Sequence, residues 1–197
     1  MRVFPECRGP MTEWPVVETI AGIEEALSRL AVRWTLGLVS NAGESDSRHV
    51  RRALARVGLE DSFDLILTAK DVGVSKSDPR FYQRLLAILG RPPGEVVVVG
   101  DDYQADVRVP TGLGMRAVWF NPGGSQPPGR ACHAAEVARM PDLVDTITTL
   151  EAGRNGQSAG VARDCDRPRA THPARPGGMT AEGDLQQGPA RDRGERA

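Results

Sequence analysis

Apolar and polar residues alternate between residues 15 and 150 in stretches that fit strands and helices in turn. Residues 35–40 and 63–68 are short apolar runs that end in polar residues, which is typical of buried strands. Residues 95–99 and 117–120 have the same character, and the first of these is wholly apolar at its centre. A strand that is covered on both faces has such a centre. The pattern therefore predicts four short strands.

Helical spacing separates these strands. Apolar residues recur three and four positions apart from Ile20 and again from Val50, where Gly58 provides a C-terminal stop. Asp78 and Pro79 fit an N-cap followed by proline in the first turn of a helix. The expected helices cover residues 20–30, 50–57, 78–89, 103–113 and 142–150. Strands that alternate with helices favour an α/β fold with a Rossmann-like parallel sheet and helices on both of its faces.

Composition divides the chain near residue 150. Residues 151–197 contain no Phe, Trp or Tyr and few large aliphatic side chains, so they cannot bury enough apolar surface to offset the entropy of ordering. We expect residues 151–197 to form a disordered tail, residues 15–150 to form the folded core, and residues 1–14 to be a short N-terminal remnant. The core is long enough for one ordinary domain.

Charge and cysteine content narrow the class of protein. A formal net charge of −1 and 40% hydrophobic residues give no strong basic field, which argues against a nucleic-acid partner. No apolar run approaches the roughly 20 residues of a membrane span, so no membrane partner is expected. Three cysteines stand far apart without any CxxC pair. A cytoplasmic location is the expectation for such a chain.

Polar side chains follow three of the predicted strands, where α/β proteins place their binding sites. Ser40 and Asn41 could hold phosphate oxygens, although both are also common turn residues. Lys76 could neutralise an anion, or could be an ordinary solvated lysine. Asp101, Asp102 and Asp106 would repel one another unless a cation such as Mg²⁺ were bound, although Asp102 could simply cap the next helix.

In this order and spacing, the segments LGLVSNAG, VGVSKSDPRFY and EVVVVGDDYQADV resemble the second, third and fourth motifs of the haloacid-dehalogenase-like hydrolase superfamily. The resemblance covers about residues 15–150. It implies that Ser40, with Asn41 beside it, and Lys76 hold the transferred phosphoryl group, and that Asp101 binds Mg²⁺ with Asp106 as the additional acidic position. It also implies a Mg²⁺-dependent phosphatase that acts on a small phosphorylated metabolite. Dehalogenase activity is less expected, because Lys76 and the acidic cluster suit phosphate and metal.

The resemblance leaves one motif without a counterpart. The superfamily uses a DxD motif after a central first strand, whose first Asp attacks phosphorus and whose second acts as acid and base. Residues 1–40 contain no Asp, and the pair Asp164–Asp166 lies in the expected tail. We therefore expect a sheet without its first central strand, a chain truncated at its N-terminus and without its cap, and no activity in the chain as given. The alternative is a non-catalytic remnant or binding module of the same fold. A phospho-receiver domain is disfavoured, because receivers place the lysine after the acidic residues.

Overall fold

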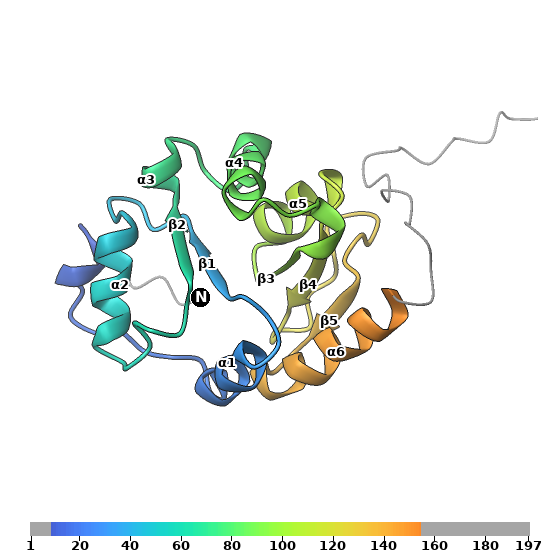
Figure 1. The fold of residues 1–197 in the computed structure, drawn as a ribbon, viewed down its shortest axis with the longest axis horizontal. Coiled ribbons are helices and arrows are strands. Elements are labelled where there is room, and N and C mark those ends of the chain that lie inside the picture. The colour runs from blue at the N-terminus through green and yellow to red at the C-terminus, as the bar shows by residue number, and fades with distance from the viewer. Residues whose placement is uncertain (1–8, 155–197) are drawn as a thin grey trace, which may run out of the picture. The chain divides into compact units, whose positions relative to one another are not determined.

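The computed structural model describes residues 9–154 (Figure 1). The first element of this described part is a short 3₁₀ turn, after which helices alternate with strands, as the hydrophobic pattern predicts. The strands are β1 (Gly37–Ser40), β2 (Leu65–Thr68), β3 (Val97–Gly100), β4 (Arg116–Phe120) and β5 (Ala135–Val137). The α-helices are α1 (Ile23–Ala31), α2 (Ser47–Ala55), α3 (Ala69–Val72), α4 (Pro79–Leu89), α5 (Val109–Gly112) and α6 (Leu143–Arg154). Further helical turns are η1 (Met11–Glu13), η2 (Pro93–Glu95), η3 (Tyr103–Arg108) and η4 (Met140–Asp142).

All strand pairs in residues 9–154 are parallel, but they form two sheets. β1 pairs with β2, with Ser40 opposite Thr68. β4 lies between β3 and β5, with Gly100 opposite Trp119. Within the described part of the chain no ladder joins β1 to β3. The α/β fold class with parallel strands is confirmed, and within residues 9–154 the strands divide between β2 and β3 into two separate sheets.

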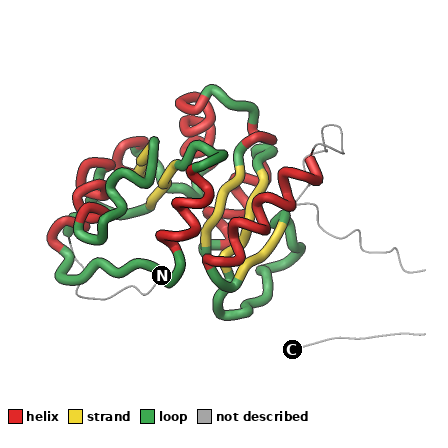
Figure 2. The backbone as a smooth tube through the Cα atoms, turned by 60° about the horizontal axis from the view of Figure 1, so that its bottom comes forward, coloured by secondary structure: helices red, strands yellow, loops and turns green. Residues whose placement is uncertain are grey.

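Helices cover both faces of the three-stranded sheet, which Figure 2 shows in yellow between helices. Alternate residues of β4 face opposite sides, as the period of a strand requires. Val118 and Phe120 pack in a cluster with residues of α1 and α6. Ala117 and Trp119 pack against Tyr103 and its neighbours in η3. The α4 helix packs its residues 81, 82 and 85 against β2 and β3 in a third cluster, which joins the two sheets through side chains.

The boundaries of α4 follow the residues that predicted them. The Asp78 carboxylate accepts a hydrogen bond from the Arg80 amide, Pro79 opens the first turn, and Gly90 ends the helix with φ 59°. That prediction is confirmed. Glycine is suited to this end because its missing Cβ removes the steric penalty for positive φ.

Three sequence expectations differ from the structure. Residues 103–108 form a π-helix that precedes the short α5, in place of one helix over residues 103–113. Pro110 has no N–H to bond to the preceding turn, and a widened turn accommodates its ring. The β5 strand, residues 135–137, was not expected, because three residues give no periodicity to recognise.

The third difference concerns the end of the core. The α6 helix continues to Arg154, so the predicted tail does not begin at residue 151. The remainder of the tail and the first eight residues of the N-terminal remnant lie outside the described residues. Within residues 9–154, none of the helices is both long and apolar enough to cross a membrane.

Candidate active site

Lys76 lies in the loop between α3 and α4, and its side chain is 13% exposed. Gly73 ends α3 with φ 82°, a left-handed turn that starts this loop. The Lys76 ammonium lies 2.7 Å from Oδ1 of Asp106, whose side chain is only 3% exposed. The structure therefore brings together two residues that stand 30 positions apart, in a pair that is shielded from water.

Asn41 follows directly after β1 and ties this loop to the first sheet. Its Oδ1 accepts a hydrogen bond of 2.8 Å from the backbone amide of Lys76. Ser40 is the last residue of β1 and is half-buried. The carboxyl end of β1 and the Lys76 loop are thus in direct contact, which is the arrangement that a shared phosphate site requires.

Asp106 has a dense set of polar neighbours. Besides the Lys76 ammonium, Oδ1 accepts a bond of 3.3 Å from the Tyr82 hydroxyl, while Oδ2 accepts one of 3.3 Å from the Asp102 amide. Gly100 lies so close that a Cβ at this position would overlap the Asp106 carboxylate. Glycine at the end of β3 therefore permits the carboxylate to pack against the strand.

Burial governs the titration of this cluster. Desolvation raises the pKa of the Asp106 carboxyl above its ordinary value, against the opposing effect of the Lys76 ammonium. Desolvation, reinforced by the nearby Asp106 charge, also raises the pKa of the Tyr82 hydroxyl. Tyr82 therefore remains a hydrogen-bond donor throughout the physiological range.

Asp101 and Asp102 have different surroundings although they are adjacent. The Asp102 carboxylate accepts bonds of 3.0 Å from the amides of Gln104 and Ala105, so it caps η3. Asp101 is exposed, and its backbone carbonyl accepts a bond of 3.1 Å from the Trp119 indole. Capping by Asp102 was the simpler of the two sequence interpretations. Asp101 lies at the carboxyl end of β3 and is exposed.

These positions bear on a magnesium site. Residues 9–154 contain no group of three or more His, Cys, Asp or Glu side chains that could hold a metal by themselves. Mg²⁺ commonly uses only one or two protein carboxylates and takes its other ligands from water and phosphate. The exposed Asp101 fits such a role. Asp106 is less suited to it, because its Oδ1 is engaged by Lys76 and its Oδ2 is buried.

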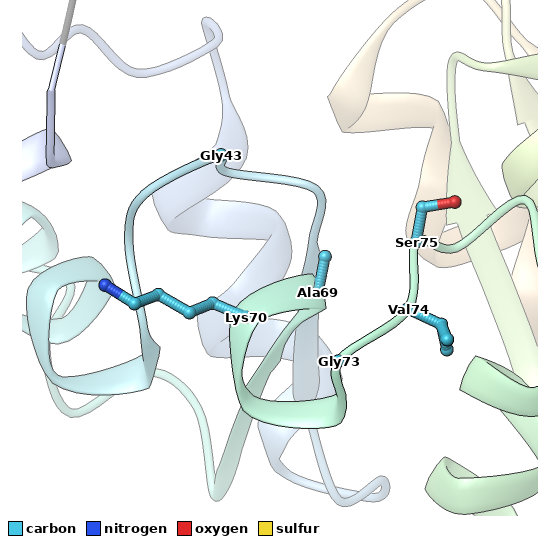
Figure 3. Close-up of a pocket in the computed structure, with 6 residues that line it drawn as sticks. All are labelled: Gly43, Ala69, Lys70, Gly73, Val74 and Ser75. Carbon is cyan, nitrogen blue, oxygen red and sulfur yellow. The ribbon is translucent and has the colours of Figure 1, made fainter.

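A shallow depression of about 340 Å³ lies beside this site, between the loop after β1 and the start of the Lys76 loop (Figure 3). Its lining residues are Gly43, Ala69, Lys70, Gly73, Val74 and Ser75. The long Lys70 side chain extends away from Ser75 and Val74, and its ammonium binds the Glu44 carbonyl at 2.7 Å. Ser75 provides the other polar side chain of the depression.

Two residues of this region were not singled out by the sequence. Tyr82 lies on the apolar face of α4, and its hydroxyl contact with Asp106 depends on the tertiary fold. Trp119 lies in a strand where any large apolar residue fits the pattern. The sequence signal that could have found both residues is chemical, since a buried tyrosine or tryptophan needs a hydrogen-bond partner for its polar atom.

Known proteins with the same features identify the family. A family model for haloacid dehalogenase-like hydrolases matches residues 11–110, and a related HAD-hydrolase-like model matches residues 73–150. A phosphoserine phosphatase of Thermus thermophilus is 41% identical over 73 residues, which are 37% of this chain and 29% of that protein.

Solved structures agree in fold. A HAD phosphatase from Thermococcus onnurineus is 31% identical with a TM-score of 0.54, over 62% of this chain and 55% of that one. A 2-haloacid dehalogenase from Pseudomonas syringae is 28% identical with a TM-score of 0.60, over 68% of this chain and 55% of that one. The chain thus spans little more than half of these structures and less of the curated relative. It belongs to the haloacid dehalogenase-like hydrolase family.

Proposed function

We propose that this chain represents a Mg²⁺-dependent phosphatase that hydrolyses the phosphate ester of a small metabolite. The observation that carries the proposal is the convergence of Lys76, Asn41 and Asp106 beside the exposed Asp101. A lysine that is held by a buried carboxylate is a fixed positive charge, suited to a phosphoryl group. The named phosphatases among its relatives support the same reaction.

Each residue has a distinct role in this proposal. The Lys76 ammonium neutralises charge that develops on the phosphoryl oxygens. Asn41 uses Oδ1 for the Lys76 amide, which leaves its NH₂ group to donate to a phosphate oxygen, and the Ser40 hydroxyl provides a further donor. Asp101 holds Mg²⁺, with Asp106 in a secondary role through Lys76. When bound, Mg²⁺ neutralises phosphate charge and orients the ester.

Dehalogenation is the competing reaction, since one similar structure is a 2-haloacid dehalogenase. Carbon–halogen cleavage offers no highly charged phosphoryl group for a lysine and a metal to neutralise. The paired Lys76 and Asp106, with Asp101 next to them, therefore favour phosphate over a halogenated acid.

A second candidate function is non-catalytic binding. In residues 9–154, β1 pairs only with β2 and β3 only with β4, so each has an edge without a ladder. Half-buried Val39, Val97 and Val99 lie on these strands. These two edges could bind a further strand.

A strand between β1 and β3 would pair with both edges, and in an active enzyme it would also carry the nucleophilic carboxylate. We propose that residues 1–197 alone show no phosphatase turnover and have marginal stability, because residues 9–154 have no strand between β1 and β3 to carry a nucleophilic carboxylate.

In-frame translation of the DNA upstream of Met1, followed by expression of any extended protein with an apolar strand and DxD, tests both candidates. Against a panel of phosphate esters, we expect Mg²⁺-dependent turnover that Asp101→Asn abolishes. Asp61→Asn, which changes an exposed carboxylate before β2, is the matched control and should retain full activity. Full activity of Asp101→Asn contradicts the metal assignment. Robust turnover by residues 1–197 contradicts the proposed lack of a nucleophile.

A further inference from the structure

Trp119 connects the centre of the three-stranded sheet to the loop that carries Asp101. It lies on β4 opposite Gly100 and is 4% exposed. Its indole N–H donates a bond of 3.1 Å to the carbonyl oxygen of Asp101, the first residue after β3. A single buried side chain thus contacts the peptide group from which the Asp101 carboxylate projects.

Packing from two other segments restrains the indole. The Tyr103 ring meets it edge to face, with centroids 4.8 Å apart and an interplanar angle of 81°. The His133 ring lies 5.7 Å away at an angle of 43°. The indole is therefore held between the start of η3 and the segment before β5.

Hydrogen bonds fix the two supporting rings as well. The Tyr103 hydroxyl accepts a bond of 3.0 Å from the Cys132 amide and lies 3.2 Å from Nδ1 of His133. The Tyr103 and His133 rings are also perpendicular, with centroids 5.8 Å apart. Because both rings are anchored to backbone or to each other, the indole has little freedom to turn its N–H away from Asp101.

The choice of side chain at position 119 is informative. Burial on β4 could be achieved by Phe or Leu, but neither could donate a hydrogen bond to Asp101. Without this donor, a partly shielded carbonyl would lose a partner, and the first turn after β3 would gain freedom. The indole N–H of Trp119 therefore binds the Asp101 loop, while its ring packs in the core.

We propose that Trp119 is a positioning residue for Asp101, which it holds in the orientation that binds Mg²⁺ at the candidate site. This inference rests on the proposed function for the assignment of Mg²⁺ to Asp101. The cluster of Trp119, Tyr103 and His133 fixes the position of Asp101 before Mg²⁺ binds. Its members lie on three different segments of the chain.

The test measures Mg²⁺ binding to residues 1–197 by titration calorimetry in the presence of inorganic phosphate, and amide hydrogen exchange of residues 101–106 without metal. Trp119→Phe removes the donor but keeps most of the ring volume. We expect it to weaken Mg²⁺ binding about three- to tenfold, the effect of one hydrogen bond. Exchange in residues 101–106 should rise by a similar factor, while the amides of β4 keep their protection. Trp34→Phe, a half-buried tryptophan beside Arg33, is the matched control and should change neither measurement.

The outcomes separate this inference from the proposed function. Loss of binding in Asp101→Asn, with parental binding and exchange in Trp119→Phe, overturns the positioning role and leaves the metal assignment intact. Parental binding in Asp101→Asn overturns the metal assignment. If the parent chain binds no Mg²⁺, the exchange measurement decides, and unchanged exchange in Trp119→Phe overturns the inference. If Trp119→Phe does not fold, Tyr103→Phe should give a smaller effect in the same direction, and its absence counts against the proposal.

Discussion

The three-stranded sheet and the β1–β2 pair both carry residues of the candidate site, but their strands differ in how deeply they are buried. β4 is buried along four of its five residues and has helices on both faces. β1 has no fully buried residue, and in the described part of the chain it pairs only with β2. The acidic side of the site, Asp101 and Asp106, is therefore built on a packed core. Ser40 and Asn41 are carried by the less buried β1–β2 pair. The same truncation of a side chain should therefore cost less free energy of unfolding in β1 than in β4.

The largest expected effect comes from breaking the ion pair of Lys76 and Asp106, which links the loop next to the β1–β2 pair to the three-stranded sheet. Lys76→Met should destabilise the fold by about 3–5 kcal/mol, because it leaves the buried Asp106 carboxylate without its partner. Chemical denaturation of the parent, Lys76→Met, Asp106→Asn and the double variant gives the coupling between the two residues. The double variant should recover much of the loss. Equal and additive losses would show that the pair does not interact.

The same variant has a pH dependence of known sign. Burial raises the folded-state pKa of Asp106, and removal of Lys76 raises it further. The stabilising effect of protonating Asp106 is fully present below the unfolded pKa and is lost as the pH rises through the folded value. The destabilisation by Lys76→Met should therefore be greatest at neutral pH and should shrink toward pH 4. A loss that is constant with pH would contradict this account.

A smaller effect is expected for two substitutions that compare the packing of β4 in the three-stranded sheet with that of β1. Val118→Ala removes two methyl groups from a fully buried position on β4, at a cost of about 2 kcal/mol. Val39→Ala on β1 removes the same groups from a half-buried position and should cost under about 1 kcal/mol. The urea midpoints of both variants measure this difference. Equal costs would show that β1 is as well packed as β4.

The mildest probe changes no residue. Native-state hydrogen exchange should show faster exchange for the amides of β1 than for those of β4, because within residues 9–154 β1 has a strand neighbour on one edge alone. Addition of a synthetic apolar strand peptide should slow exchange in β1 and β3 together if their edges accept it. Protection of β1 that matches β4 without any peptide would remove the distinction between the halves.

The sequence determined most of the local elements and the family. The limits of α4 were readable from Asp78, Pro79 and Gly90, because caps and stops are local effects of backbone geometry. The strands were readable from short apolar runs, and the family from three motifs in order. Ser40, Asn41 and Asp101 were predicted from their place directly after predicted strands. Lys76 was predicted from its place before the helix that begins at Asp78, and Asp106 from its spacing after Asp102. Their roles stay predictions.

Only the tertiary structure decided which of these residues touch. The contacts of Asp106 with Lys76 and Tyr82 join residues 24 or more positions apart, and no local pattern encodes such pairings. The support of Asp101 by Trp119 likewise depends on the register between β3 and β4. The π-turn of η3 and the three-residue β5 were also beyond periodicity. Local propensity is set by neighbours in the chain, whereas burial, ion pairing and ring packing are set by neighbours in space.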